Sequence, residues 1–254
     1  MIFKVAGALR VPRRVKSILA RYRCLFLLLF ITTMLLTAHF LLIPSVFGSY
    51  NNGCYMSQED RSNLKYMLTA IVNAFDKYGV IYWLDYGTLL GAVRYKSIVP
   101  WDHDGDISVL LTQEGGNMQA ALQEIRDKGI HANSMIAQYK GLQVDIMRWK
   151  KYEGSYKRKS QTMLYKYYPP TNEDNAIVKF HHTLESFPYA WIESQARLKF
   201  LDTYASVPKE YMKLLRLRYP WTLYFPFPYK WKCWAPCSLV DKAEGGCVEN
   251  KIEA

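Results

Sequence analysis

The sequence lacks several features that would place it in a familiar structural class. Its 254 residues contain no internal repeat and no low-complexity tract, so repeat and fibrous architectures are excluded. No Asn-x-Ser/Thr sequon occurs, so glycosylation sites give no information about topology. The sequence shows no obvious second domain. The length therefore predicts one domain with a core of its own.

Acidic residues are absent from the start of the chain, where the first one is Glu59. Residues 24–43 carry no formal charge, and a helix of that length spans about 30 Å, the thickness of a bilayer's hydrocarbon core. Because basic residues stay cytosolic, the pattern predicts a cytosolic tail (1–23), a single-pass type II anchor (24–43), a stem (44–56) and a lumenal domain (57–254). The basic residues of the tail are Lys4, Arg10, Arg13, Arg14, Lys16, Arg21 and Arg23.

A cleaved signal peptide is the alternative interpretation of the same residues. Its apolar region would span about 7–15 residues and would end in small residues. The run at 24–43 is longer, and the following IPSVFGSY lacks an Ala-x-Ala-like site. An uncleaved anchor is favoured, with the domain in the lumen of the Golgi apparatus or the endoplasmic reticulum. The sequence does not separate these two compartments.

The positive charge of the chain is concentrated in this tail. The formal net charge is +11, of which the tail supplies seven, leaving +4 for the other residues. So mild an excess does not indicate nucleic-acid binding, and we expect no nucleic-acid partner. It is compatible with anionic small molecules.

Cysteine is scarce, with five residues. Cys24 lies at the edge of the predicted anchor. Cys54, Cys233, Cys237 and Cys247 lie in the predicted lumenal part, where an even number predicts two disulfides with three possible pairings. A zinc site at the last three cysteines is the alternative, but their spacing is not a strong zinc signature.

The lumenal part alternates between helical and strand patterns. Ser57 and Asp60 resemble a capping box that opens a helix, which ends at Gly79. The remaining patterns predict an α+β domain with a mixed sheet flanked by helices. The predicted strands are 80–84, 106–111, 131–138, 142–149 and a pair within 197–206, with strand and loop at 152–168. The predicted helices are 85–95, 118–128 and 209–218.

The stretch PWDHDGDISV at 100–109 sets Asp102, Asp104 and Asp106 on alternate residues before an apolar strand. Asp104 and Asp106 point the same way on a strand. Neighbouring carboxylates repel each other, and their pKa rises unless a cation neutralises them. Mg²⁺ or Mn²⁺ is the cation that suits hard oxygen ligands and phosphates.

A third carboxylate, Asp145, lies between Val144 and Ile146 in a second apolar strand. We expect this strand to pair beside the first, so that Asp104, Asp106 and Asp145 hold one ion. Turn formation and helix capping are the alternative role for such residues. An EF-hand is excluded, because its required glycine and closing glutamate would fall at Ile107 and Gln113.

The stretch 83–109 (WLDYGTLLGAVRYKSIVPWDHDGDISV) resembles the signature of the LicD family, a Gly-Thr-Leu-Leu-Gly turn followed by Pro-Trp-Asp-x-Asp-x-Asp. Residues 143–147 (QVDIM) resemble its Val-Asp-Ile-Phe element. Residues 200–220 (FLDTYASVPKEYMKLLRLRYP) resemble its C-terminal Val-Pro element and helix. The likeness spans 66–231. Gly105 and Met147 depart from the usual pattern, which leaves the substrate and the partners open.

The resemblance implies a nucleotidyltransferase-like fold and a phosphotransferase of LicD type. Such an enzyme moves a phosphorylated alcohol, phospho-alditol or phosphocholine, from a CDP-linked donor to a hydroxyl of a glycan or glycoprotein and releases CMP. By position, Gly87 and Thr88 match the phosphate-side turn. Asp104, Asp106 and Asp145 match the catalytic metal carboxylates.

Further residues near the motif have two interpretations each. Arg94 is a candidate phosphate clamp or a surface ion-pair partner. Asp102 is a candidate supporting group behind the metal ligands. Asp85 either touches substrate or caps the next helix. Trp83 and Trp101 stack on the cytosine base or belong to the core.

Two other functions compete with this prediction. A sugar-nucleotide glycosyltransferase with an Asp-x-Asp motif would need a nucleotide-binding half before the motif, and about sixty residues separate the predicted anchor from Asp104. It also leaves Asp145 without a role. A catalytically inactive, membrane-anchored member of the same fold is the second alternative. The presence of all three carboxylates and of both turn glycines, Gly87 and Gly91, argues against it.

Overall fold

The chain divides into two compact units, Met1–Asn52 and Gly53–Ala254. The computed structural model describes residues 13–42, 53–111, 117–167, 180, 184–220 and 222–224. In the first unit, helix α1 (Arg13–Thr37) is followed by a π-helix, η1 (Ala38–Leu42). None of the helices in the described ranges combines the length and the apolar character that a membrane crossing requires, so the predicted anchor at 24–43 is not supported.

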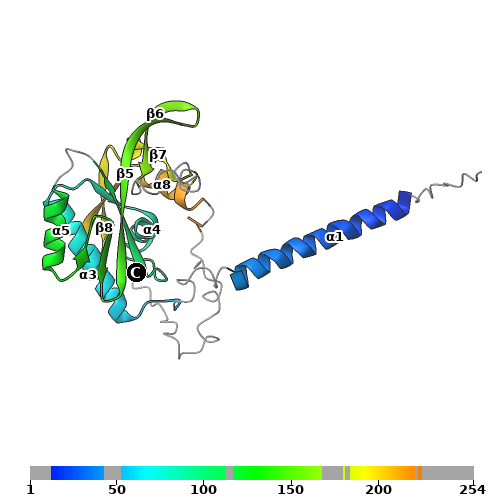
Figure 1. The fold of residues 1–254 in the computed structure, drawn as a ribbon, viewed down its shortest axis with the longest axis horizontal. Helices are drawn as coiled ribbons and strands as arrows, with labels where there is room; N and C mark the ends of the chain where they lie inside the picture. Colours follow the sequence, from blue (N-terminus) through cyan, green and yellow to red (C-terminus); the bar gives the residue numbers. More distant parts are fainter. Residues whose placement is uncertain are drawn as a thin grey trace, which may run out of the picture. The chain divides into compact units, whose positions relative to one another are not determined.

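A mixed sheet forms the centre of the second unit (Figure 1). Its strands follow the order β1, β2, β5, β4, β3, with β6 beside β5 and β7 beside β6. The pair β2–β5 is parallel, and the other pairs are antiparallel. The strands are β1 (Tyr82–Leu84), β2 (Asp104–Leu110), β3 (His131–Ala132), β4 (Ile136–Tyr139), β5 (Leu142–Tyr156), β6 (Lys159–Lys166) and β7 (Phe187–Pro188).

Helices cover both faces of this sheet (Figure 1). Helices α3 (Gln58–Lys77) and α5 (Met118–Asp127) lie on one face, where a methyl group added at Gly105 would come within 2.8 Å of Leu68 of α3. Helices α4 (Tyr86–Tyr95) and α8 (Tyr211–Arg218) contact each other on the opposite face. The predicted α+β class with a mixed sheet and flanking helices is confirmed.

A separate hairpin packs beside β1. It consists of β8 (Gln195–Phe200) and β9 (Thr203–Pro208), which form a two-stranded sheet. The Gln195 side chain donates a hydrogen bond of 2.7 Å to the carbonyl of Tyr82, and the Ser206 amide donates one of 3.3 Å to the Tyr82 hydroxyl. A short 3₁₀ helix, η3 (Tyr189–Trp191), precedes the hairpin. The hairpin therefore holds the strand that leads into α4.

The boundaries of α3 follow the predicted signals. The Ser57 hydroxyl accepts a hydrogen bond of 3.0 Å from the Asp60 amide at the helix start. Gly79 adopts φ +66° beyond the helix end, a conformation that glycine tolerates best. Both predictions are confirmed, because caps depend on residues close in sequence.

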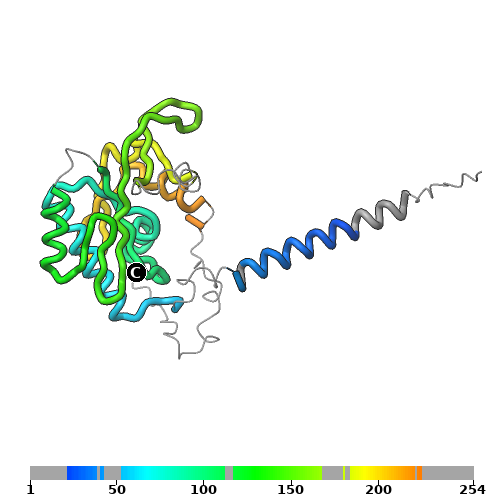
Figure 2. The backbone as a smooth tube through the Cα atoms, in the orientation of Figure 1, coloured from blue at the N-terminus to red at the C-terminus, as the bar shows by residue number. Residues whose placement is uncertain are grey.

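Three strand predictions differ from the structure. Strand β2 begins at Asp104 instead of position 106, and β5 continues to Tyr156. The predicted strand 131–138 is a hairpin of β3 and β4, because the Asn133 side chain accepts hydrogen bonds from the amides of Met135 and Ile136 and forms a turn. The outer half of β5 and β6 extend from the sheet as a hairpin, visible in the backbone tube of Figure 2.

Two of the five cysteines lie in the described ranges. Cys24 is free and exposed, and Cys54 is disulfide-bonded. Cys233, Cys237 and Cys247 lie outside the described residues, so the pairing of the four predicted lumenal cysteines stays a prediction.

Candidate active site

The register of β2 and β5 brings acidic residues together at one end of the sheet. Asp106 pairs with Asp145, and Asp104 pairs with Gln143. Because alternate residues of a strand share a face, these four side chains lie on the face toward α4. The predicted pairing of the two acidic strands is confirmed. The Asp145 carboxylate also accepts a hydrogen bond of 2.6 Å from the Gln143 side chain.

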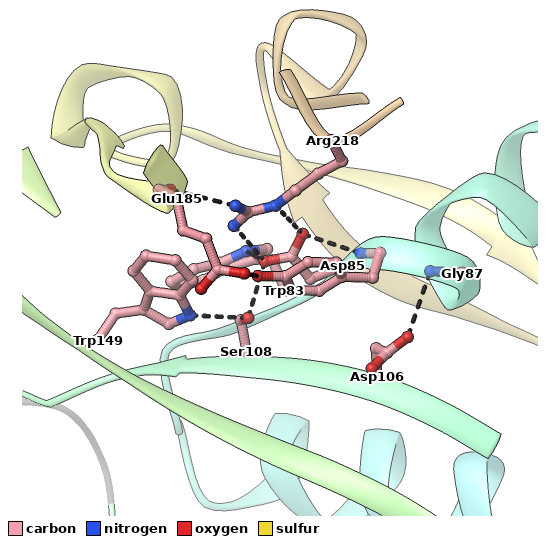
Figure 3. A network of polar contacts seen from close by, with 9 residues as sticks. Trp83, Asp85, Gly87, Asp106, Ser108, Trp149, Glu185 and Arg218 are labelled. Atoms are coloured by element: carbon pink, nitrogen blue, oxygen red, sulfur yellow. Dashed lines mark hydrogen bonds and ion pairs between the residues drawn. The ribbon is translucent and has the colours of Figure 1, made fainter. Parts of the chain in front are cut away.

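The first turn of α4 is bonded directly to the start of β2. The Gly87 amide donates a hydrogen bond of 3.2 Å to Asp106 Oδ2 (Figure 3). The Thr88 hydroxyl accepts one of 2.7 Å from the Asp106 amide. The Asp85 amide donates one of 3.2 Å to the Asp106 carbonyl. Gly87 and Thr88 therefore hold the Asp106 backbone and carboxylate at the helix start.

Gly87 also makes room for a second carboxylate. A Cβ atom added at Gly87 would lie 2.1 Å from Asp102 Oδ2 and 3.6 Å from Asp106 Oδ2. Any side chain at this position would therefore displace the Asp102 carboxylate. The two carboxylates reach the same point of the α4 backbone from opposite ends of the Asp102–Asp106 stretch.

The electrostatic environment of these carboxylates is unfavourable. Burial, followed by the charges of Asp104, Asp85 and Asp145, raises the pKa of Asp106 well above its usual range. Burial, followed by the charge of Asp104, raises the pKa of Asp102 in the same way. Acids that lie close to other acids in a partly buried place favour protonation or a bound cation.

The end of α8 lies close to the same acids. Burial, followed by the charges of Asp106 and Asp102, raises the pKa of the Tyr219 phenol above its usual range. Tyr219 is the C-cap residue of α8, and its amide donates to the carbonyl of Leu215. The candidate site is therefore bordered by α4 on one side and by the end of α8 on another.

No set of three or more His, Cys, Asp or Glu side chains in the described part of the chain is arranged to hold a metal ion. The donors themselves suit a hard divalent cation, because the Asp102 and Asp106 oxygens approach Gly87 together and both pKa values are raised. Mg²⁺ commonly uses one or two carboxylates and completes its shell with water and phosphate. Asp104, Asp106 and Asp145 as metal ligands stay a prediction.

A buried ion pair lies immediately beside this acidic cluster. Asp85 is fully buried, and the Arg218 side chain is 4% exposed. Arg218 Nη2 lies 3.3 Å from Asp85 Oδ2, and Arg218 Nε lies 3.4 Å from Asp85 Oδ1. Asp85 Oδ2 also accepts hydrogen bonds from Ser108 and Trp83, as Figure 3 shows. Asp85 thus caps α4 from a buried position and bonds to protein groups.

Aromatic rings surround the Arg218 guanidinium. Its carbon lies 4.3 Å from the ring centre of Tyr86, 5.2 Å from that of Trp149 and 5.5 Å from that of Phe187. Trp83 is fully buried and contacts the rings of Trp149 and Phe187, so it belongs to the core and does not stack on a base. The sequence did not predict a role for Arg218, since its position in the last turn of a helix is ordinary for a basic residue.

Arg94 makes contacts that neither predicted role included. Its guanidinium donates hydrogen bonds to the backbone carbonyls of Thr222 and Leu223, the former at 2.8 Å. Arg94 therefore joins α4 to the segment after α8. Both hydrogen bonds come from Nη2 of Arg94, and the role of Arg94 as a phosphate clamp stays a prediction.

Sequence comparisons with known proteins identify a family. Residues 79–210, just over half of the chain, match the family model described as LicD/FKTN/FKRP, nucleotidyltransferase domain. The chain is 26% identical over 155 residues to "Ribitol 5-phosphate transferase FKRP" of Mus musculus and of Homo sapiens, a match that covers 59% of this chain and 29% of each relative.

A shorter match, 47% identical over 38 residues, joins it to "Uncharacterized protein RP689" of Rickettsia prowazekii (strain Madrid E) and covers 15% of this chain and 14% of that protein. The chain thus spans less than a third of the length of the FKRP proteins. The family model covers every candidate site residue named from the sequence. Arg218 lies beyond its end. The protein belongs to the LicD family.

Proposed function

We propose that this protein transfers a phosphorylated alcohol from a CDP-linked donor to a hydroxyl of a glycan or glycoprotein. The acceptor oxygen forms a bond to the phosphorus that carries the alcohol, and the bond from that phosphorus to the bridging oxygen breaks. CMP leaves with the bridging oxygen, and the acceptor proton passes to a carboxylate of the site. Membership of the LicD family and the similarity to a ribitol 5-phosphate transferase support the reaction class.

The observation that carries this proposal is the contact between the α4 start and the acidic strand. The amide end of a helix attracts phosphate oxygens, and α4 presents its first turn to Asp106 through Gly87 and Thr88. A diphosphate would lie beside the helix start and the carboxylates of β2 and β5, where a cation held by these carboxylates would meet it. The protein would act chiefly by positioning the donor and the acceptor.

Asp104, Asp106 and Asp145 would hold a divalent cation, Mg²⁺ or Mn²⁺, with Asp102 in support. When bound, the cation supplies charge neutralisation for the diphosphate and for the leaving CMP. The raised pKa values of Asp102 and Asp106 support a cation at this cluster, since a cation would relieve the repulsion among the acids. Removal of the cation by dialysis against EDTA should abolish transfer of the phosphorylated alcohol, and added Mg²⁺ should restore it.

The test is the incubation of the purified chain with CDP-ribitol, CDP-glycerol and CDP-choline in separate reactions with Mg²⁺, followed by measurement of CMP. We expect CMP release above the background from at least one donor, and a loss of release in Asp104→Asn and Asp145→Asn. Parallel reactions with UDP- and GDP-sugars test the glycosyltransferase alternative. CMP release equal in wild type and in both variants would remove the acidic cluster from the mechanism.

Calorimetry measures the binding of CDP. It distinguishes an inactive protein from an active one whose donor is missing from the panel. Binding of CDP that depends on Mg²⁺ and is lost in Asp104→Asn supports a functional site. A wild type that binds no CDP in the presence of Mg²⁺ favours the inactive alternative.

Placement in the secretory pathway is also part of this proposal. Its support is the sequence pattern of a basic start followed by the uncharged run at 24–43. Microscopy of the full chain against Golgi and endoplasmic reticulum markers tests it, and a cytosolic distribution would contradict it.

A further inference from the structure

The Asp85–Arg218 ion pair connects two segments that lie 133 residues apart in the sequence. Arg218 belongs to the last turn of α8, and its Nη1 also donates a hydrogen bond of 3.1 Å to the carbonyl of Glu185. Asp85 is the N-cap residue of α4, where its carboxylate accepts a hydrogen bond of 2.9 Å from the Tyr86 amide. The pair therefore fixes the start of one helix to the end of another.

Tyr86, the first residue of α4, has an unusual backbone conformation. Its φ angle is +41°, in the left-handed region that residues other than glycine rarely adopt and that costs on the order of 1–3 kcal/mol. Its ring lies against the Arg218 guanidinium, and its hydroxyl donates a hydrogen bond of 2.8 Å to Glu185 Oε1. The Asp85–Arg218 pair and Glu185 thus hold Tyr86 at both its backbone and its ring.

The helix start that this pair fixes carries the groups that bond to Asp106. Gly87 and Thr88 follow Tyr86 directly and bond to the carboxylate and to the amide of Asp106. A shift of the α4 start would therefore move the contacts of Asp106. Displacements of about 1 Å can lower the rate of an enzyme about 10²-fold.

We infer that Arg218 is a positioning residue, which through Asp85 sets the conformation of the α4 start and thereby the placement of Asp106. Arg218 bonds to Asp85 and lies against the ring of Tyr86, and it acts on Asp106 through these two residues. Helix α8 is then a required part of the candidate site, although it lies outside the segment that matches the family model. The activity part of this inference rests on the proposed function.

The test uses the full chain with Arg218→Met and Arg218→Lys. Hydrogen exchange measured by mass spectrometry reports on each helix, and CMP release reports on turnover. In Arg218→Met we expect exchange to rise more at residues 86–95 than in α3 and α5, and a kcat lower by about 10²-fold. Arg218→Lys keeps a charge but loses the fork that contacts two carboxylate oxygens, so we expect an intermediate effect on both measurements.

Arg197→Met is the matched control. Arg197 also forms a close ion pair, 2.6 Å from Asp76, but its side chain is 45% exposed and lies on the β8–β9 hairpin. We expect its removal to leave exchange at 86–95 and kcat unchanged. Equal changes in Arg197→Met and Arg218→Met would show general destabilisation and would overturn the inference.

The remaining outcomes also decide the question. A folded Arg218→Met with wild-type exchange at 86–95 overturns the inference. If Arg218→Met does not fold, Arg218→Lys decides: faster exchange at 86–95 supports the inference, and unchanged exchange overturns it. If the wild type releases no CMP from any CDP-alcohol, the proposed function fails, while the exchange result still tests the link between Arg218 and α4.

Discussion

Two acidic regions lie side by side in this protein and are built in opposite ways. Asp85 is fully buried, and its charge is met by Arg218 and by donors from Trp83, Ser108 and the helix backbone. The second region, the Asp102–Asp106 stretch with Asp145, brings acids next to other acids. In the first region a basic side chain of the protein, Arg218, neutralises the acid. The second region suits a cation that binds from solution.

This difference separates a structural carboxylate from a binding one. A buried charge paired within the protein contributes to a defined conformation, and removal of its partner is strongly destabilising. Acids that repel each other lower the stability of the folded state, and they persist where a ligand relieves the repulsion. The same substitution, Asp to Asn, should therefore have opposite effects on stability in the two regions.

The largest expected effect on stability is that of Asp85→Asn. It leaves the Arg218 guanidinium buried without its carboxylate partner, which costs about 3–5 kcal/mol of unfolding free energy. Urea denaturation followed by circular dichroism measures the loss. A loss below about 1 kcal/mol would mean that the Asp85–Arg218 pair contributes no more to stability than an exposed ion pair does.

Asp106→Asn should change stability in the other direction. Replacing the carboxylate removes a charge whose folded-state pKa is raised by burial and by three acidic neighbours. Without a divalent cation, we expect the melting temperature to rise by about 2–4 °C, the shift that corresponds to about 1 kcal/mol. Turnover should fall by about 10²–10³-fold. A melting temperature lower than that of the wild type would contradict the contrast between the two regions.

Gly87→Ala tests the space shared by the two carboxylates. The new methyl group would overlap Asp102 Oδ2, so the Asp102 side chain must move away. Because a side chain moves at low cost, we expect unfolding free energy to change by less than about 1 kcal/mol and turnover to fall about tenfold. A matched control is Gly141→Ala, where no atom lies within 4 Å of the added methyl group but φ is +81°. That control should lose stability and keep turnover.

The pH dependence of stability tests the same contrast without a substitution in the wild type. The raised pKa of Asp106 means that the folded state binds more protons than the unfolded chain above about pH 4. The unfolding free energy should therefore fall as pH rises from 4 toward the raised pKa, by at most about 1.4 kcal/mol per pH unit. The stability difference between wild type and Asp106→Asn should be small near pH 5 and larger near pH 8. If this stability difference became smaller with rising pH, the pKa of Asp106 in the folded state would be lowered and not raised.

Much of the candidate site followed from local sequence patterns. The alternation of Asp104 and Asp106 placed them on one face of a strand, and the apolar neighbours of Asp145 marked a second strand, whose pairing beside the first is confirmed. The cap of α3 at Ser57 is confirmed for the same reason, since both signals involve residues a few positions apart. Helix capping by Asp85, one of its two predicted roles, is confirmed. The bonds of Arg94 to Thr222 and of Asp85 to Arg218 were not predicted, because these partners lie 128 and 133 residues away.

The sequence by itself determined the approximate place of most helices and strands and that acidic residues gather at the start of one strand, because capping and alternation act between near neighbours. Tertiary structure alone decided which of these acids is neutralised. Packing of α8 against α4 brings Arg218 to Asp85, whereas the Asp106 carboxylate accepts a hydrogen bond from the backbone amide of Gly87. The physical reason is that ion pairing depends on distances of a few ångströms between side chains whose positions only the packed core defines.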